Sequence, residues 1–391
     1  MKKLTAVLLT ISMIATLVGC GSADSGSSAA GSDMKVAMIT DYGDITDQSF
    51  NQATYEAAKA WCTEAGVDYT YYKPEGDSTA DRVAMVDKAA ADGYNVMLMP
   101  GYAFAGAIVE TAETYPDVKF VALDVAAGDI LSEALGDQYD WNPDNWDVKE
   151  HYHSDNVYCA VYQEELAGYM VGVAAVKLGY TKIGFLGGMA VPAVIRYGYG
   201  FVQGANDAAA ELGITVDVKY AYGNQFYGDA DITAAMDTWY ANGTEVVFAC
   251  GGGIYTSAAE AAAKVGGKVI GVDVDQSHII DGKYGEGMTV TSAMKGLGAT
   301  VDTLLNAIKD GKWDDYKGQI QTLGLVSGDD PLVNYVQIPM DCTQWSDGFT
   351  QDDYKKLVAD MFSGAVKVSN DISAAEPSGS NVTVDFQGNL K

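Results

Sequence analysis

The sequence predicts an α/β protein of two lobes, each built around a parallel β-sheet. Short apolar runs alternate with helical patterns, which is typical of parallel strands joined by right-handed crossovers. The alternation lapses after residue 126 and starts again near residue 182, and 391 residues are more than one ordinary domain contains. A chain that builds one such sheet and then another forms two lobes across a cleft, where a small ligand binds by hinge closure.

The first residues have the pattern of an export signal. Two lysines precede an apolar stretch, residues 4–17, which is too short for a membrane span. The stretch ends in LVGC, residues 17–20, which resembles the lipobox of bacterial lipoproteins and so implies removal of residues 1–19 as a lipoprotein signal peptide and a lipid on Cys20. Residues 20–33 are rich in Ser and Gly and predict a flexible tether. A plain secretory signal with an incidental cysteine is the alternative.

The composition predicts an exported globular body. The formal charge is −29, and loss of the two signal lysines leaves −31 because residues 1–19 carry no other charge. A phosphate backbone needs a basic surface, so nucleic acid is not an expected partner. The four later cysteines form no CxxC pair or zinc pattern, so we expect buried free thiols or at most one disulfide, and no metal or cofactor. These cysteines are Cys62, Cys159, Cys250 and Cys342.

The first series of elements runs to residue 162. Its apolar runs predict strands, and the alanine-rich patterns between them predict helices. The predicted strands are 35–39, 67–72, 94–101, 118–124 and 156–162, and the helices are 53–65, 78–92 and one that ends at residue 113. Residues 126–155 are polar and rich in aromatic residues, which predicts a long irregular connection, either a functional loop or an insertion.

The second series follows a helix over residues 164–178. Its predicted strands are 182–188, 216–222, 246–250 and 269–273, and its helices are 195–212, 229–242, 257–265 and 296–309. The tail, residues 371–391, is polar and contains Ser and Gly, a composition typical of disorder. We therefore expect the tail to add nothing to a binding site.

Residues 40–52 form the strand-to-helix turn around which the rest of the chain is organised. Ligands bind at such turns because the carboxyl ends of parallel strands leave a crevice. Asp41 would accept hydrogen bonds at the strand end, and Phe50 would offer its ring to a flat ligand. The other interpretation makes Asp47 or Ser49 a helix cap and Phe50 part of the core.

Three strand ends in the second series carry further candidates. The glycine triplet 251–253 opens a helix, so its N–H groups can meet a ligand oxygen or simply permit close packing. Asp273 can accept hydrogen bonds from vicinal hydroxyls, as sugar recognition requires, or belong to a solvated turn or a helix cap. Lys295 can donate into the cleft or lie in solvent.

Taken together, the motifs resemble the BMP family of basic membrane lipoproteins. The matching sequences are 41–43 (DYG), 47–52 (DQSFNQ), 187–189 (GGM), 200–205 (GFVQGA), 271–276 (GVDVDQ) and 291–295 (TSAMK). Members of this family are substrate-binding lipoproteins of ABC importers, and the PnrA-like members take purine nucleosides. The resemblance covers about residues 36–369 of the sequence. It implies a type I periplasmic-binding-protein fold, with two Rossmann-like lobes and an interlobe cleft.

The same resemblance implies three crossings between the lobes, near Gln163, Ser292 and Gly318. The implied boundaries are 34–163 with 293–318 for lobe 1, 164–292 with 319–370 for lobe 2, and 371–391 for the tail. The helix that follows Lys295 then returns to the first lobe.

The resemblance also implies an aromatic clamp. Phe50 would stack on one face of a base, and Phe226 on the other. The loop 222–229 differs from the usual family sequence, so Tyr227 or Phe201 can take the second place instead.

The polar part of the implied site comes from both lobes. Asp41 and Asp124 would accept hydrogen bonds from the base or the ribose, Asp273 would take ribose hydroxyls, and Lys295 would donate to the sugar end. The full implied ligand-binding set is Asp41, Phe50, Asn51, Asp124, Phe226, Gly251, Asp273 and Lys295.

The sequence and the resemblance favour a lipid-anchored, monomeric receptor at the extracytoplasmic face of a bacterial cell membrane. It would bind a purine nucleoside and pass it to an ABC permease and its ATPase. A receptor of the same fold for a sugar or another polar small molecule, for uptake or sensing, is the alternative. An enzyme is disfavoured, because the sequence has no GxSxG elbow, no nucleotide-cofactor fingerprint and three histidines.

Overall fold

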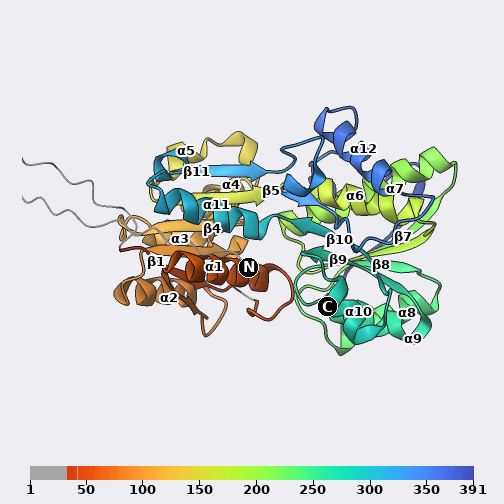
Figure 1. The fold of residues 1–391 in the computed structure, drawn as a ribbon, viewed down its shortest axis with the longest axis horizontal. Helices are drawn as coiled ribbons and strands as arrows, with labels where there is room; N and C mark the ends of the chain where they lie inside the picture. Colours follow the sequence, from red (N-terminus) through yellow and green to blue (C-terminus); the bar gives the residue numbers. More distant parts are fainter. Residues whose placement is uncertain (1–32, 42) are drawn as a thin grey trace, which may run out of the picture.

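The computed structural model describes residues 33–41 and 43–391, and within them the chain forms two α/β lobes (Figure 1). The sheet of the first lobe has the strand order β11-β5-β4-β3-β1-β2, and the sheet of the second has the order β12-β10-β9-β8-β6-β7-β13. Every pair in both sheets is parallel except β10 with β12. The predicted fold class is confirmed. Cys20 lies outside the described residues.

The first lobe takes its elements from two stretches of the chain, one that ends with β5 and one that runs from α11 to β11. Its strands are β1 (Lys35–Ile39), β2 (Asp68–Tyr72), β3 (Val96–Pro100), β4 (Lys119–Leu123), β5 (Val157–Tyr162) and β11 (Gln319–Leu323). Its helices are α1 (Phe50–Ala65), α2 (Thr79–Ala91), α3 (Ala105–Thr111), α4 (Ala127–Leu135), α5 (Val148–His151) and α11 (Leu297–Lys309).

The second lobe is built in the same way. Its strands are β6 (Lys182–Gly187), β7 (Val216–Tyr222), β8 (Val246–Cys250), β9 (Lys268–Asp273), β10 (Thr289–Lys295), β12 (Val336–Gln337) and β13 (Val382–Asn389). Its helices are α6 (Glu164–Lys177), α7 (Pro192–Leu212), α8 (Ala230–Ala241), α9 (Tyr255–Val265), α10 (Ser277–Tyr284) and α12 (Gln351–Phe362).

Short 3₁₀ turns of the two lobes lie at Tyr102–Phe104, Gly136–Gln138, Pro143–Asn145, Trp313–Asp315 and Pro331–Val333.

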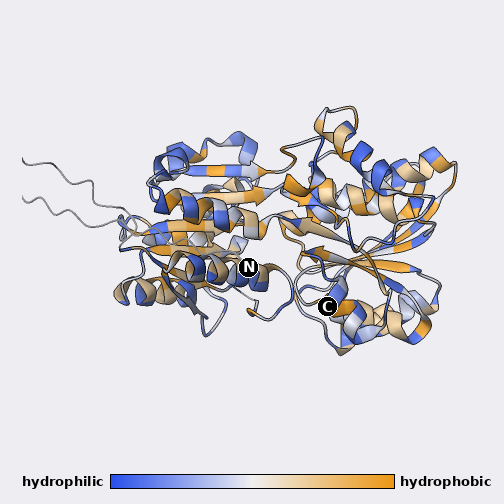
Figure 2. Ribbon diagram, in the orientation of Figure 1, coloured by the Kyte–Doolittle hydropathy of each residue, from blue (hydrophilic) through white to orange (hydrophobic). Residues whose placement is uncertain are grey.

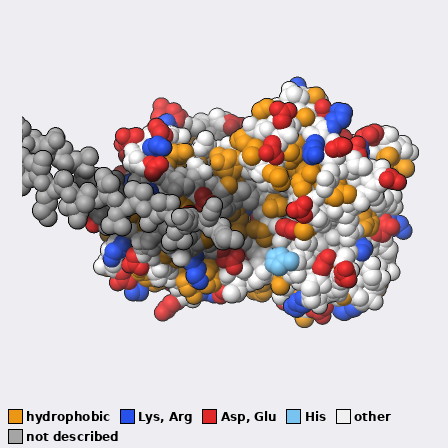
Figure 3. All heavy atoms as spheres, in the orientation of Figure 1, with side chains coloured by type: hydrophobic (Ala, Val, Ile, Leu, Met, Phe, Trp, Pro, Cys, Tyr) orange, Lys and Arg blue, Asp and Glu red, His pale blue; other side chains and the backbone are white. Residues whose placement is uncertain are grey.

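Burial explains why the central strands were predictable. Strands β3 and β8 are buried along their whole length, as expected for parallel strands covered by helices on both faces. Figure 2 shows apolar strands in both sheets and polar outer faces on the helices. On the face seen in Figure 3, acidic side chains are spread over both lobes, in line with the formal charge of −29.

The second and third crossings lie later in the chain than the family resemblance implied. Strand β10 stays in the second sheet up to Lys295, so the chain crosses after Lys295 rather than near Ser292. Strand β11 pairs with β5 in the first sheet, so the next crossing follows Leu323 rather than Gly318. The boundary at 318 was wrong because the sequence of β11, QIQTL, is mostly exposed and has no apolar run.

Two stretches expected to be irregular are partly regular. Residues 126–155 contain α4 and α5, and residues 130 and 131 of α4 are buried. The tail expected to be disordered contains β13, which adds a parallel strand to β7 at the edge of the second sheet. Alternation of Val382, Val384 and Phe386 with polar residues is the strand signal that the overall polarity of the tail concealed.

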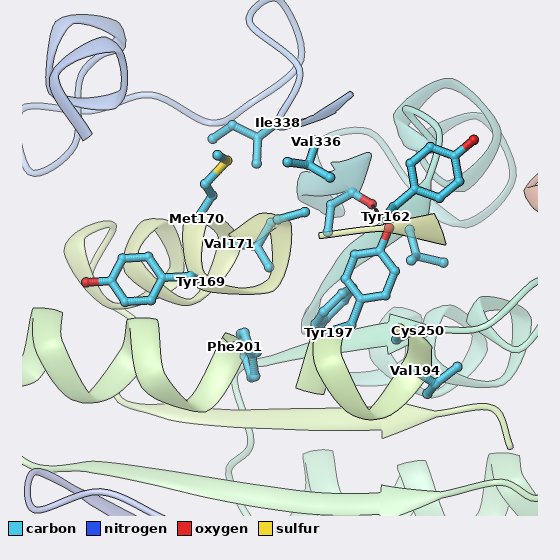
Figure 4. Packing of buried hydrophobic residues seen from close by; sticks show 14 of the residues in the cluster. Tyr162, Tyr169, Met170, Val171, Val194, Tyr197, Phe201, Cys250, Val336 and Ile338 are labelled. Carbon is cyan, nitrogen blue, oxygen red and sulfur yellow. Dashed lines mark hydrogen bonds between the residues drawn. The ribbon is translucent and has the colours of Figure 1, made fainter. Parts of the chain in front are cut away.

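Helices α6 and α7 touch through four glycines. A Cβ atom on Gly168 would lie 2.1 Å from the carbonyl oxygen of Tyr197, and one on Gly172 would lie 2.2 Å from that of Phe201. Gly200 and Gly204 of α7 meet the backbone of α6 in the same way, each at 2.1 Å. Figure 4 shows the side chains that flank this contact. The main chains of the two helices thus fix the distance between the helices over this contact.

The cysteines of the described residues are free thiols. Cys62, Cys159 and Cys250 are buried, whereas Cys342 is exposed, against the expectation that all four are buried. Within residues 33–41 and 43–391, no helix has the length and apolar character needed to cross a membrane.

Candidate functional site

A cavity of about 820 Å³ lies between the two lobes. All eight residues of the implied ligand-binding set line this cavity. Most of them lie at the carboxyl ends of strands β1, β4, β8, β9 and β10, and the others come from the start of α1 and from the loop after β7. This volume is in the range of small-molecule sites, roughly 300 to 1,000 Å³. The cavity therefore has the position and the size of a ligand site in this fold class.

Asp41 lies where β1 ends. Its Oδ1 atom accepts hydrogen bonds from the backbone N–H of Gly43 at 3.1 Å and from Nδ2 of Asn51 at 3.2 Å. A Cβ atom on Gly43 would lie 1.9 Å from Asn51 Nδ2, so glycine is needed there for the amide to reach Asp41. Burial raises the pKa of Asp41 to about 6, and these two hydrogen bonds only partly oppose that rise.

Helix α1 is capped by Asp47, one of the two caps considered. The Asp47 carboxylate accepts backbone N–H groups of Ser49 at 2.9 Å and of Asn51 and Gln52 at 3.0 Å. Ser49 makes no capping hydrogen bond, and its Oγ atom instead donates to Oδ2 of Asp273 at 2.5 Å. A residue at the start of the first lobe's first helix thus contacts the second lobe.

Lys295 is the centre of a buried ion cluster. Its Nζ atom lies 2.5 Å from Oδ2 of Asp124, 3.7 Å from Oε1 of Glu164 and 3.7 Å from Oδ1 of Asp273, and 3% of its side chain is exposed. Burial alone would lower the pKa of Lys295, but the three carboxylates outweigh it and raise that pKa. The ammonium therefore stays charged. Of the two interpretations of Lys295, the solvated one is wrong, because Lys295 ends β10 and its side chain lines the cavity.

Asp124 and Asp273 occupy equivalent places in the two lobes, directly after β4 and at the end of β9. Both have left-handed backbone conformations, with φ of 61° and 68°. A residue with a side chain rarely adopts this conformation, which costs about 1 to 3 kcal/mol. Such backbone strain is concentrated at functional sites, so its presence at both carboxylates supports a role for them.

The two candidate stacking rings reach the cavity from different lobes. Lys295 Nζ lies 4.7 Å from the centroid of the Phe50 ring. A Cβ atom on Gly188 would lie 2.5 Å from Cδ1 of Phe226, and one on Gly251 would lie 3.1 Å from it. Gly251 therefore lines the cavity and also makes room for the Phe226 ring.

The alternative aromatic residues differ in position. Phe201 is completely buried in the core of the second lobe and does not line the cavity, so it is excluded as the second ring. Tyr227 lines the cavity but is 62% exposed.

Sequence reasoning missed several residues of this site. Arg196 of α7 lines the cavity, and its Nε atom donates to Oε2 of Glu164 at 2.7 Å. The pair joins the start of α6 to α7, beside the glycine contact. Two neighbours of Arg196 on α7, Val194 and Tyr197, also line the cavity (Figure 4). No local pattern signals a pair 32 residues apart, since only the helix packing brings the two side chains together.

Some buried acceptors around the cavity have no hydrogen-bond partner within the described part of the chain. They are Oδ1 of Asn51 and Oδ1 of Asp124, and both residues line the cavity. Buried polar atoms are normally paired, so these atoms favour a ligand with several N–H or O–H donors. In residues 33–41 and 43–391, no group of three or more His, Cys, Asp and Glu is arranged to hold a metal ion.

Comparisons with known proteins agree with this geometry. Residues 34–334 match the model of the Bmp family, described as ABC transporter substrate-binding protein PnrA-like. The "ABC transporter nucleoside-binding protein BmpA" of Lactococcus lactis is 31% identical over 84% of this chain and 90% of that protein. An uncharacterized lipoprotein of Pyrococcus furiosus is 24% identical over 82% of this chain and 75% of that protein.

The fold has solved counterparts. An ABC transporter solute-binding protein of Aeropyrum pernix superposes with a TM-score of 0.63, with 20% identity over 87% of this chain and 88% of that one. This likeness supports the fold alone, whereas the family match covers most of the chain and contains the eight candidate residues. The family match ends before β12, α12 and β13. The chain belongs to the Bmp family of PnrA-like substrate-binding proteins of ABC transporters.

Proposed function

We propose that this substrate-binding protein holds a purine nucleoside in the interlobe cavity and presents it to the permease of an ABC importer. The observation that carries the proposal is the convergence of Phe50, Asp124, Asp273 and Lys295 on one cavity. Such a site offers an apolar ring beside buried carboxylates, which suits a flat ligand with hydroxyl donors. The name of the Lactococcus lactis relative points to the same ligand class.

In this proposal the base lies between Phe50 and Phe226. Stacking on an aromatic ring contributes about 1 to 3 kcal/mol per base and discriminates poorly between bases. Asp41 and Asn51, which are hydrogen bonded to each other beside Phe50, would read the polar edge of the base. Oδ1 of Asn51, which has no hydrogen-bond partner among the residues that the structure describes, would accept from a base N–H group.

The ribose would lie against the ion cluster. Asp124 and Asp273 would accept from its hydroxyl groups, and Lys295 would donate to a sugar oxygen. The cluster has two cationic side chains, Arg196 and Lys295, and three carboxyl side chains, Asp124, Glu164 and Asp273, so its formal charge is −1. A neutral ligand with several donors suits this balance better than an anionic one.

Closure of the lobes would trap the ligand. Ser49 and Gln48 of the first lobe already hydrogen bond to Asp273 and Gln276 of the second. Closing buries carboxylates, which is favourable when ligand donors replace their water. The proposed cycle therefore couples ligand binding to lobe closure, and the permease receives the closed form.

The proposed location follows from the predicted signal and the lipoprotein name of the Pyrococcus relative. Cys20 would carry the lipid and residues 20–33 would tether a monomer to the outer face of the cell membrane. Substitution Cys20→Ala in the full chain should release the protein from membranes to the soluble fraction. Equal membrane retention of both forms would contradict the anchor.

The test of the ligand is direct. Protein purified without denaturation would be analysed by mass spectrometry for retained small molecules, and then stripped and titrated calorimetrically with adenosine, guanosine, inosine and ribose. We expect at least one purine nucleoside to bind with micromolar or tighter affinity, and ribose to bind at least about tenfold more weakly, because ribose lacks the stacked base. Binding of ribose or another sugar without any nucleoside would replace the proposal with the sugar alternative.

A further inference from the structure

The C-terminal strand ends beside the loop that carries Phe226. Strand β13 pairs with β7, and Asn389 lies opposite Tyr222, the last residue of β7. The backbone N–H of Leu390 then donates to the carbonyl oxygen of Tyr222 at 2.8 Å. The chain is thereby held to the point where the loop 223–229 begins.

The loop around Phe226 is closed by polar side chains. Gln225 Nε2 donates at 2.9 Å both to the carbonyl oxygen of Tyr227 and to Oδ2 of Asp229. Oδ1 of Asp229 accepts the N–H groups of Asp231 and Ile232, each at 3.0 Å, and so caps α8. Phe226 lies within the segment 225–229 that these hydrogen bonds hold together.

Lys391 contacts the side chains of Gln225, Asp229 and Asp231. Its Nζ atom donates to Oδ2 of Asp229, lies 3.4 Å from Oε1 of Gln225 and lies 3.9 Å from Oδ2 of Asp231. The side chains of Lys391 and Asp229 are 29% and 27% exposed, so their ion pair is less screened than a fully exposed one. An ammonium on Oε1 also fixes which end of the Gln225 amide faces Tyr227 and Asp229.

We propose that Lys391, two residues after the end of β13, is a positioning residue for the ligand site: it holds Gln225 and Asp229 so that Phe226 keeps its place in the cavity. This inference rests on the proposed function only for the identity of the ligand. It assigns a role in binding to the tail, beyond the residues that the family model matches.

Hydrogen exchange tests the inference without any ligand. The amides of Gly223, Asn224 and Asp229 are hydrogen bonded, so their exchange reports opening of the loop. In the ligand-free protein, Lys391→Met should exchange about two- to fivefold faster at these amides than the unchanged protein. The matched control is Lys219→Met, which removes an ion pair between β7 and β13 themselves, Lys219 with Asp385 at 2.5 Å, outside the loop 223–229.

Binding then tests the route through Phe226. With the nucleoside of highest affinity, Lys391→Met should weaken the Kd by about two- to fivefold, whereas Lys219→Met should leave it unchanged. In a Phe226→Ala background, Lys391→Met should have no further effect, because the ring it positions is gone. Equal thermal unfolding temperatures of Lys391→Met and Lys219→Met would show that the weaker binding of Lys391→Met does not come from lower overall stability.

The outcomes are distinct. Unchanged loop exchange in Lys391→Met, or fully additive losses with Phe226→Ala, would overturn the inference. If the unchanged protein binds no nucleoside, the proposed function fails, while faster exchange confined to the loop still supports the positioning role. The binding comparison is then repeated with the small molecule that mass spectrometry finds in the purified protein.

Discussion

Ser49 and Asp273 join the two lobes: Oγ of Ser49 donates to Oδ2 of Asp273 at 2.5 Å. Beside it, Nε2 of Gln276 donates to the carbonyl oxygen of Gln48 at 3.0 Å. The two contacts lie at the edge of the cavity, so whatever binds to Asp273 also acts on the link between the lobes.

Substitution Ser49→Ala removes the first contact. We expect the closed form to become less populated and ligand affinity to fall roughly fivefold, since a hydrogen bond to a charged group contributes about 1 kcal/mol or more. Small-angle scattering with saturating ligand and calorimetry check the two effects. The exposed Ser373→Ala is the control, and wild-type affinity in Ser49→Ala would refute the link.

Substitution Lys295→Met leaves three buried carboxylates without their shared cation. Loss of one partner of a buried ion cluster costs about 3 to 5 kcal/mol of unfolding free energy, and ligand binding should be lost with it. Burial already raises the pKa values of Glu164 and Asp273. Protonation at pH 5 should therefore recover part of the stability that Lys295→Met loses at pH 7.5.

Urea unfolding at the two pH values measures this recovery. The control is Lys355→Met, which removes a lysine from the exposed surface of α12. A Lys295→Met protein as stable as the control at pH 7.5 would show that the cluster is not held by that ammonium.

The raised pKa of Asp41, about 6, predicts a pH-dependent affinity. Its folded-state pKa exceeds the ordinary value of 3.8, so ionised Asp41 costs stability above pH 6, and this cost disappears as the pH falls towards 3.8. If the ligand donates a hydrogen bond to the ionised carboxylate of Asp41, ligand affinity falls as the pH falls through 6, because the ionised form is lost. At pH 5 only about one tenth of the carboxylate is ionised, so affinity should fall by up to roughly tenfold from pH 7.5.

Calorimetry from pH 5 to 7.5 tests this dependence. In Asp41→Asn the neutral amide does not titrate, so the affinity of this variant should be lower and should change much less with pH. A slope equal to that of the unchanged protein would assign the titration to another group.

Substitution Phe226→Ala should weaken nucleoside binding by about 1 to 3 kcal/mol, because one face of the base loses its ring. The adjacent Tyr227→Ala is the matched control, since Tyr227 is largely exposed. Calorimetry with a nucleoside and with ribose separates the causes, because only the nucleoside should respond. If Tyr227→Ala has the larger effect, Tyr227 is the second ring of the clamp.

The sequence analysis located strands well where apolar runs are long and buried, as in β3 and β8. It could not locate β11 or β13, because a strand with an exposed face has little apolar signal and depends on pairing with a distant partner. The motifs led to eight residues that share one cavity. Arg196 and Glu164 stayed hidden because their contact depends on how closely α6 and α7 pack, which no short motif encodes.

The left-handed backbone at residues 124 and 273 has a consequence for engineering. Glycine adopts that conformation without steric conflict, so Asp→Gly at either position should relax the main chain while deleting a carboxylate from the cavity. Both carboxylates are partners of the buried Lys295 ammonium, and loss of one partner costs about 3 to 5 kcal/mol, more than the roughly 1 to 3 kcal/mol of strain that glycine would relieve. A search for robust variants should therefore leave both aspartates in place, because the charge cluster keeps the main chain in a conformation that it would otherwise leave.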